Sequence, residues 1–388
     1  MSEAFIYRSG GDGYSTISFD IPVLQRQNAT TLSEARRSLA ATTVGNYALF
    51  GGGYASSSAT DVVDAYGNSL TRTIPTALSV SRYNLAATPV GNYALFGGGS
   101  NLDVVDAYDN SLTRTTPTAL SQARHNLAAT NIGDYALFGG GQSGSSSYSD
   151  VVDAYDSSLT RTTPTVLSFI RDRLAAASIG NYALFGGGTT ASTSDVVDAY
   201  DNSLARTTPT ALSQARRSLA ATTVGNYALF GGGYASSSAT DVVDAYDNSL
   251  TRTIPTALSV AREVLASTKI GNYALFGGGY VSSTYRDTVD AYDTSLTRTT
   301  HTELSVGRRN LSATSVGNYA LFGGGQSGNT SSSDVVDAYS VSNNQIKIYP
   351  GTKYSFNGQP EQTSSTWQTL DFQGQLNGYL KIKDTNIN

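Results

Sequence analysis

The stretch Tyr-Ala-Leu-Phe-Gly-Gly-Gly at residues 47–53 decides the fold, because the chain repeats it seven times. Successive copies lie 42 to 47 residues apart, with the Phe at positions 50, 96, 138, 185, 230, 276 and 322. Self-similarity at such a period indicates one supersecondary unit copied around a ring or along a stack. Function must therefore be sought in what differs between the copies.

Each copy contains four short segments rich in β-forming residues, which we name strands A to D. In the second copy they lie at residues 85–88, 93–97, 103–108 and 112–116. Such segments, separated by turn residues, predict a four-stranded meander. Strand A is small and apolar, as the narrow inner end of a wedge-shaped blade requires, whereas strand D is rich in Thr and Arg, as expected of a solvated outer edge.

This unit resembles a kelch repeat. It has an Arg before strand A, a Gly doublet ending strand B, an aromatic residue closing strand C, and a similar period. The resemblance covers residues 28–339 and implies an all-β fold, a seven-bladed kelch-like β-propeller with small β-rich flanks. One mark of the family is absent, since Leu-Thr-Arg stands where strand D usually carries Trp. We therefore expect a bacterial or phage variant.

The two ends of the repeat region indicate how the ring closes. The seventh copy stops at Tyr339 without a strand D, while residues 29–36 match residues 117–124, which precede the third copy. We expect an N-terminal strand to complete the seventh blade. Residues 345–349 are the alternative for the same position.

The flanks differ from the repeats in sequence. We therefore expect three regions: an N-terminal β segment at 1–27, the propeller at 28–340, and a C-terminal β segment or attachment domain at 341–388. The C-terminal region holds the only Trp, Trp367. Strand-like runs occur at 345–349, 353–356, 367–372 and 379–382, and in the N-terminal region at 5–7, 14–19 and 21–23. The flanks resemble phage tail-fibre proteins, which implies attachment to other virion or tail proteins through the termini.

Composition excludes several classes of protein. With 25 Lys and Arg against 30 Asp and Glu the net charge is −5, and no basic footprint for nucleic acid is present. No apolar run is long enough to insert into a membrane, and no secretory signal is visible at the start. We expect a virion or extracellular location without a classical signal peptide, with the cytoplasm as the alternative.

Catalytic and cofactor chemistry finds little support in the sequence. The chain has no Cys, which removes thiolate nucleophiles and thiolate metal sites. Its two histidines, His125 and His301, occupy non-equivalent positions of different copies, so that we expect neither a metal site nor a catalytic triad. The sequence predicts no catalytic residue, no cofactor and no enzyme.

An Arg precedes strand A in every copy, and strand C carries two repeated Asp residues, which are Asp103 and Asp106 in the second copy. We expect blade-to-blade Arg–Asp pairing or capping of loop carbonyls. The alternative is that the arginines face the central channel and bind an anionic sugar or peptide; its candidates are Arg82, Arg124 and Arg262.

Length variation between the copies is confined to one connection, the B–C loop between the third Gly and the first Asp. Its sequences run over 54–60, 100–102, 142–149, 189–194, 234–240, 280–286 and 326–333. The D–A crossings, which precede the next strand A, have a constant length but vary in residue type. They should emerge at the same end of the ring. Variable loops on a rigid scaffold are typical of a binding surface, although Ser- and Gly-rich loops can also be spacers.

The variable loops are rich in Tyr, Ser, Asn and Gln, a composition that suits stacking and hydrogen bonding to polar ligands such as sugars. We expect the ligand contacts at Tyr54, Tyr83, Tyr148, Tyr234, Tyr280, Tyr285, Gln142 and Gln326.

Together these features favour a non-catalytic binding protein that recognises a cell-surface receptor, a glycan or a protein, as part of a phage or prophage tail. The alternative is an intracellular kelch scaffold that binds a protein partner. A third hypothesis, implied by the kelch resemblance alone, is a sugar-processing enzyme.

Overall fold

The computed structural model describes residues 14–18, 24–144, 147–328, 331–341, 345–348, 353–356, 362–363, 368–371 and 379–383. Within these residues every regular element is a β-strand. The chain forms two units, Arg26–Ser340 and the combination of residues 1–25 with residues 341–388. The first unit contains all seven copies of the repeat.

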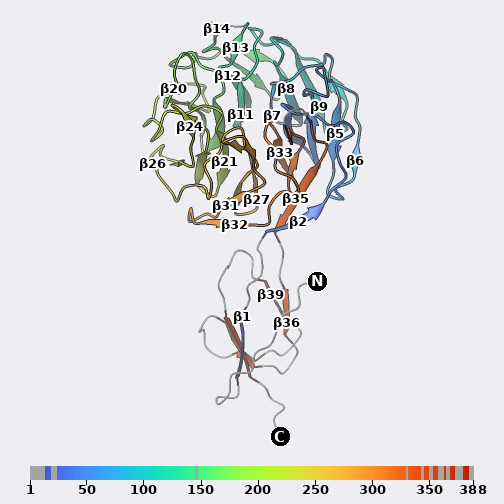
Figure 1. Cartoon of the computed structure of the whole chain (residues 1–388), viewed down its shortest axis with the longest axis vertical. Helices are drawn as coiled ribbons and strands as arrows, with labels where there is room; N and C mark the ends of the chain where they lie inside the picture. Colours follow the sequence, from blue (N-terminus) through green and yellow to red (C-terminus); the bar gives the residue numbers. More distant parts are fainter. Residues whose placement is uncertain are drawn as a thin grey trace. The chain divides into compact units, whose positions relative to one another are not determined.

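Each copy folds into an antiparallel four-stranded sheet in the order A–B–C–D, as the sequence predicts. Figure 1 shows the A strands near the middle of this unit and the D strands at its rim. The A strands are β3 (Ala40–Val44), β7 (Ala86–Val90), β11 (Ala128–Ile132), β17 (Ala175–Ile179), β21 (Ala220–Val224), β27 (Ala266–Ile270) and β33 (Ser312–Val316). The B strands are β4 (Tyr47–Gly51), β8 (Tyr93–Gly97), β12 (Tyr135–Gly139), β18 (Tyr182–Gly186), β22 (Tyr227–Gly231), β28 (Tyr273–Gly277) and β34 (Tyr319–Gly323).

The C strands are buried, whereas the D strands of the first six blades are short and more exposed. The C strands are β5 (Val63–Tyr66), β9 (Val105–Asp109), β15 (Val152–Asp156), β19 (Val197–Asp201), β25 (Val243–Asp247), β31 (Val289–Tyr292) and β35 (Val336–Val341). The D strands are β6 (Arg72–Thr73), β10 (Arg114–Thr115), β16 (Arg161–Thr162), β20 (Arg206–Thr207), β26 (Arg252–Thr253), β32 (Arg298–Thr300) and, in the seventh blade, β2 (Leu24–Asn28).

The N-terminal strand β2 closes the ring, which confirms that prediction. It lies beside β35 as the outer strand of the seventh blade. Its Arg26 forms an ion pair of 3.4 Å with Asp337, where the second blade pairs Arg114 with Asp106 at 2.8 Å. The alternative segment has another partner, since β36 (Gln345–Ile348) pairs with β39 (Gln368–Asp371).

A closed circle of backbone hydrogen bonds surrounds the central axis. In each blade the residue two positions after the conserved Arg donates its N–H to the carbonyl of the equivalent residue in the preceding blade. The seven donors, at N···O distances of 2.9 to 3.1 Å, are Ser38, Asn84, Asn126, Arg173, Ser218, Val264 and Asn310. Because Ser38 bonds to Asn310, the first and seventh blades are joined as the others are, and the repeat forms a closed toroid.

Packing between blades explains the invariant Phe-Gly pair. The Phe ring of one blade lies against the last Gly of strand B in the preceding blade; a Cβ added to Gly97 would stand 2.8 Å from the ring of Phe138. The next residue, Gly98, has a φ of +67°, a conformation that favours glycine. These glycines therefore serve close packing and the exit from strand B.

The second unit contains six strands among the described residues. Four pair in the order β1 (Tyr14–Ser18), β40 (Tyr379–Lys383), β37 (Lys353–Phe356) and β38 (Gln362–Thr363), and β36 and β39 form the remaining pair. The predicted strands at 14–19, 345–349, 353–356, 367–372 and 379–382 are thus found with small shifts. The predicted runs at 5–7 and 21–23, and Trp367, lie outside the described residues.

Candidate functional site

The toroid has two different ends. We call the end with the B–C loops and the D–A crossings the loop face, and the end with the A–B turns (45–46 and equivalents) and the C–D turns (67–70 and equivalents) the turn face. Backbone bridges place the first two together: Arg37 N donates to Tyr54 O at 3.1 Å and Tyr54 N to Arg37 O at 2.7 Å. The same bridge recurs in blades three to seven. The expected clustering of variable connections at one end is therefore confirmed.

Three of the B–C loops are small hairpins. They consist of the strand pairs β13 (Gln142–Ser143) and β14 (Ser147–Tyr148), β23 (Tyr234–Ala235) and β24 (Ser238–Ala239), and β29 (Tyr280–Val281) and β30 (Thr284–Tyr285). Each hairpin is fixed at its base by the bridge to the D–A crossing of its own blade. A loop fixed in this way loses less conformational entropy when it binds a ligand.

Arginine–tyrosine stacks are the main side-chain feature of the loop face. The Arg37 guanidinium lies 4.8 Å from the centroid of the Tyr54 ring, and that of Arg217 lies 4.6 Å from the centroid of Tyr234. Arg309 contacts two rings of the preceding blade, at 4.3 Å from Tyr280 and 5.5 Å from Tyr285. Such cation–π contacts hold both partners and leave flat polar surfaces at the loop face.

The structure brings five of the predicted tyrosines together in pairs or stacks. Tyr54 and Tyr83 meet edge to face with centroids 5.4 Å apart, and so do Tyr280 and Tyr285 at 5.2 Å. All five are half-buried on the loop face, the fifth being Tyr234. Each ring is therefore held by the protein and still exposes part of its surface.

Two further loop candidates belong to blade three. Gln142 and Tyr148 pair across the hairpin of that blade. Both are half-buried. Gln326 differs, because it is buried: its Oε1 accepts a hydrogen bond from Arg309 Nε at 3.2 Å and its Nε2 donates to the carbonyl of Gly328 at 3.1 Å. Gln326 supports the Arg309 stack and offers little surface to a ligand.

The predicted contacts Arg82, Arg124 and Arg262 are wrong. Their side chains are fully buried, and each pairs with the strand C Asp of its own blade. Arg82 Nη2, for example, donates to Asp106 Oδ2 at 2.7 Å and to the carbonyl of Phe96 at 3.2 Å.

The arginine ring is therefore structural, with two details that differ from expectation. The pairs form within one blade and not between blades, and a second Arg on strand D, Arg114 in blade two, shares the same carboxylate. Burial lowers the pKa of the Arg82 guanidinium, and the charge of Asp106 opposes this effect. The second predicted role, capping of loop carbonyls, is confirmed by the bond from Arg82 Nη1 to the carbonyl of Val80 in the D–A crossing, at 3.4 Å.

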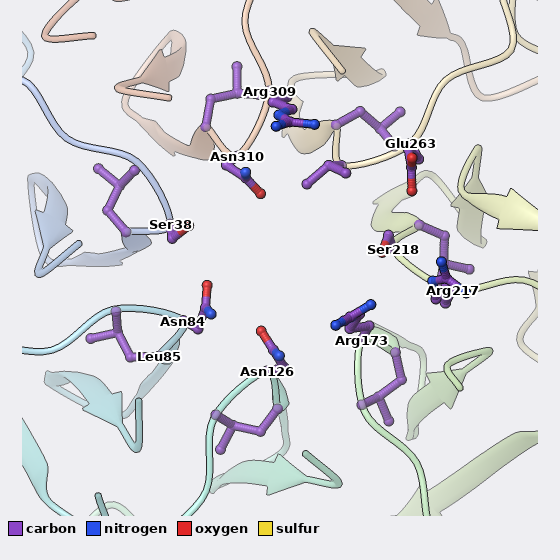
Figure 2. A pocket seen from close by; sticks show the side chains of 17 residues that line it. Ser38, Asn84, Leu85, Asn126, Arg173, Arg217, Ser218, Glu263, Arg309 and Asn310 are labelled. Atoms are coloured by element: carbon purple, nitrogen blue, oxygen red, sulfur yellow. The ribbon is translucent and has the colours of Figure 1, made fainter. Parts of the chain in front are cut away.

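A cavity that the sequence did not reveal lies at the centre of the loop face. It has a volume of about 520 Å³, and Figure 2 shows side chains from all seven blades around it. Its lining comes from the first three positions after each buried Arg. The signal was present in the sequence, because the second of these positions reads Ser, Asn, Asn, Arg, Ser, Val and Asn around the ring, although the residue after it is Leu in every blade.

Titratable groups near this cavity have perturbed pKa values. Burial raises the pKa of the Glu263 carboxyl, and the charges of Arg217, Arg309 and Arg173 oppose the rise. Burial likewise raises the pKa of Asp172, whose Oδ1 has no hydrogen-bond partner. Burial lowers the pKa of His125, whose Nδ1 lies 2.6 Å from Asn101 Oδ1. His301, in blade six, instead bonds to Thr299 at 2.8 Å.

Among the described residues, no group of three or more His, Cys, Asp or Glu side chains is arranged to hold a metal ion. In the same part of the chain no helix has the length and apolar character needed to cross a membrane.

Comparison with known proteins supports the fold alone. No family model matches the sequence, and no curated protein matches it. Among solved structures, one titled "Structure of YjhT" is similar with a TM-score of 0.56 at 13% identity, over 66% of this chain and 94% of that one. That neighbour is a propeller protein. The chain is thus a seven-bladed β-propeller, a fold compatible with a binding or scaffold role.

Proposed function

We propose that this chain is a non-catalytic binding protein that recognises a cell-surface glycan through its loop face, as a kelch-like component of a phage or prophage tail or fibre. This places it on a virion or outside the cell, with the second unit as the attachment to other tail proteins. The observation that carries the proposal is the set of half-buried tyrosines held by Arg stacks and fixed hairpins. Sugars offer apolar ring faces to such tyrosines and hydroxyls to the neighbouring Ser and Asn.

The path of the chain through the propeller fits recognition at the loop face. Strand β35 is a C strand and ends at the turn face, and β2 is a D strand and begins there. Both connections to the second unit therefore leave the propeller at the turn face. The loop face, where all length variation lies, carries neither connection.

A protein receptor, or the partner of an intracellular scaffold, is the second candidate. One observation favours it: the D–A crossing of blade four exposes Phe169 and Ile170, at 44% and 42%, where blade three has Gln122 and Ala123. Exposed neighbouring apolar side chains are common at protein interfaces. This pair occurs once, whereas the Tyr stacks extend over several blades.

Glycan arrays and binding to host cells test the proposal. We expect the wild-type chain to bind, and the double variant Tyr234→Ala with Tyr280→Ala to lose binding at least tenfold, since stacked aromatic contacts contribute about 1 kcal/mol each. The control is Asn92→Ala, an exposed position on the turn face. Absence of glycan and cell binding together with co-purification of a cytosolic partner would establish the scaffold role instead.

A further inference from the structure

The cavity at the centre of the loop face has the size of a small-ligand site. Its volume of about 520 Å³ lies within the range of roughly 300–1,000 Å³ that is usual for such pockets. Each blade contributes to its wall through the residues that follow the buried Arg, and the backbone circle fixes their positions. Side chains at the mouth therefore stand on a rigid frame.

Charged side chains line only part of this cavity. Blades one to three contribute the neutral side chains of Ser38, Asn84 and Asn126. Blades four to seven contribute three arginines and Glu263, besides the neutral side chains of Ser218, Val264 and Asn310. Figure 2 shows Arg173 beside Asn126 at the opening, Arg217 beside Ser218, and Arg309 beside Asn310 across the opening from Asn126. The mouth is locally positive although the whole chain carries a net charge of −5.

Arg173 differs from its counterparts in its side chain and not in its backbone, because the φ of all seven ring positions lies between +52° and +56°. It has a φ of +52°, in the left-handed region that Asn adopts at low cost and Arg does not. Blades two, three and seven place Asn at this position. An Arg at this position is therefore less favourable than the Asn of those blades, and the same holds for Val264 in blade six.

Arg173 is also the cation most free to bind. Its side chain is 46% exposed, and within the described residues its ion contact is Nε to Asp172 Oδ2 at 3.6 Å, which leaves both terminal nitrogens available. Asp172 itself is buried. By contrast, Arg217 is stacked on Tyr234, and Arg309 is held by Tyr280 and Gln326.

We propose that this cavity binds the carboxylate of an acidic sugar, with Arg173 as the principal anion contact and the Asn side chains of the ring, first of all the adjacent Asn126, as hydrogen-bond partners of the sugar hydroxyls. A guanidinium binds a carboxylate through two parallel hydrogen bonds, and Arg217 adds positive potential from the next blade. This inference rests on the proposed glycan recognition and specifies its ligand: a glycan that carries a uronic acid residue at an accessible end.

The test compares two probes on the wild-type chain and three variants by calorimetric titration; one of these variants is the double variant Tyr234→Ala with Tyr280→Ala described above. The probes are an oligosaccharide ending in glucuronic acid and the same oligosaccharide with its carboxyl group reduced to an alcohol. The key variant is Arg173→Asn, which places in blade four the residue that blades two, three and seven already hold at this ring position, so that folding is retained. The control is Lys269→Ala, which removes an exposed cation from a hollow lined by the turn-face glycines Gly225, Gly271 and Gly317.

We expect the wild-type chain and Lys269→Ala to bind the acidic probe about tenfold or more tightly than the neutral one, and Arg173→Asn to lose this preference. Equal binding of both probes by the wild type, or a preference that survives Arg173→Asn, overturns the inference. Binding of the neutral probe alone, lost in the Tyr234→Ala and Tyr280→Ala variant, overturns it while leaving glycan recognition intact. Binding of neither probe also overturns it, and the array and host-cell assays then decide the proposed function separately.

Discussion

Blades one and five are almost the same sequence in two different settings. Residues 36–80 and 216–260 differ only at Gly67, which is Asp247 in the second copy. Their internal geometry agrees: the buried Arg–Asp pair measures 2.8 Å in both, and the Arg–Tyr stack measures 4.8 Å and 4.6 Å. A blade therefore determines its own core and its own loop stack.

The two copies differ in what their neighbours place beside the loop. Tyr54 of blade one meets Tyr83 of blade two edge to face. The equivalent of Tyr83 in blade six is Glu263, which is close enough to Arg217 for the charge to affect its pKa. The same loop thus lies beside an aromatic ring in one place and beside a carboxylate in the other. Recognition at the loop face is consequently a property of neighbouring blades in combination.

The largest effect that tests this comparison concerns the shared core. Arg36→Met and Arg216→Met each leave a buried Asp without its partner, which costs about 3–5 kcal/mol of unfolding free energy. We expect equal losses in the two blades in urea unfolding. Arg72→Met, at a partly exposed member of the same network, should cost about 1 kcal/mol or less. Unequal losses at Arg36 and Arg216 would show that a blade does not determine its own core.

Ligand binding should separate the two copies by a smaller amount. Tyr54→Ala and Tyr234→Ala remove the same ring from the same loop, so that any difference between them comes from the neighbouring blade. With a uronate-ended glycan we expect the larger loss, roughly tenfold, at Tyr234, because its Arg217 partner also lines the central cavity. Surface plasmon resonance measures both variants, and a larger loss at Tyr54 would reverse the assignment.

Gly67→Asp makes blade one identical to blade five and should stabilise the protein by about 0.5–1 kcal/mol. In blade five Asp247 Oδ1 accepts hydrogen bonds from the N–H groups of Ser249 and Thr251, at 2.8 and 2.9 Å. Gly67 has no such cap, its φ is not positive, and a Cβ there would have 3.9 Å of space. The substitution also reduces the freedom of the unfolded chain. A rise of the thermal midpoint checks this, with Asp247→Gly as the opposite change.

The smallest expected effect is a pH dependence of the stability of the fold. It should come from Glu263 beside the loop of blade five, and it has no counterpart beside blade one, where Tyr83 takes the place of Glu263. Because burial raises the pKa of Glu263, the folded protein binds its proton more readily than the unfolded chain does. The contribution of this group to stability is therefore greatest at low pH and is lost as the pH rises through the raised pKa. Glu263→Gln should remove that dependence and stabilise the fold slightly at neutral pH, within about 1 kcal/mol. Thermal unfolding at pH 4 to 8 measures it; an unchanged profile would contradict the assignment.

The blades could be predicted because each copy of the repeat contains the residues that form and pack one blade. The Phe that packs on the preceding blade, the Gly that accepts it and the Arg that holds strand C recur at fixed spacing, and residues 29–36 match the repeat closely enough to show which strand closes the ring. The tyrosine stacks were partly predictable, since composition placed the tyrosines on the loop face but could not show that Arg37 or Arg309 would cover them.

The charged cavity could not be predicted in the same way. Its side chains are about one blade apart in sequence and meet only because the ring closes. The sequence instead drew attention to Arg82 and its equivalents, whose repetition in every blade reflects a buried ion pair and not a ligand site. The informative position was the neighbouring one that varies, where Arg173 and Val264 interrupt a series of Ser and Asn.

The central claim is that the loop face is the recognition surface. Hydrogen–deuterium exchange of the full chain with and without a bound uronate-ended glycan tests it most directly. The account predicts protection of the amides in 234–240, 280–286 and the ring around Arg173, with the A–B turns at 45–46, 91–92 and 271–272 unchanged. Protection confined to those turns, with the B–C loops unaffected, would contradict it.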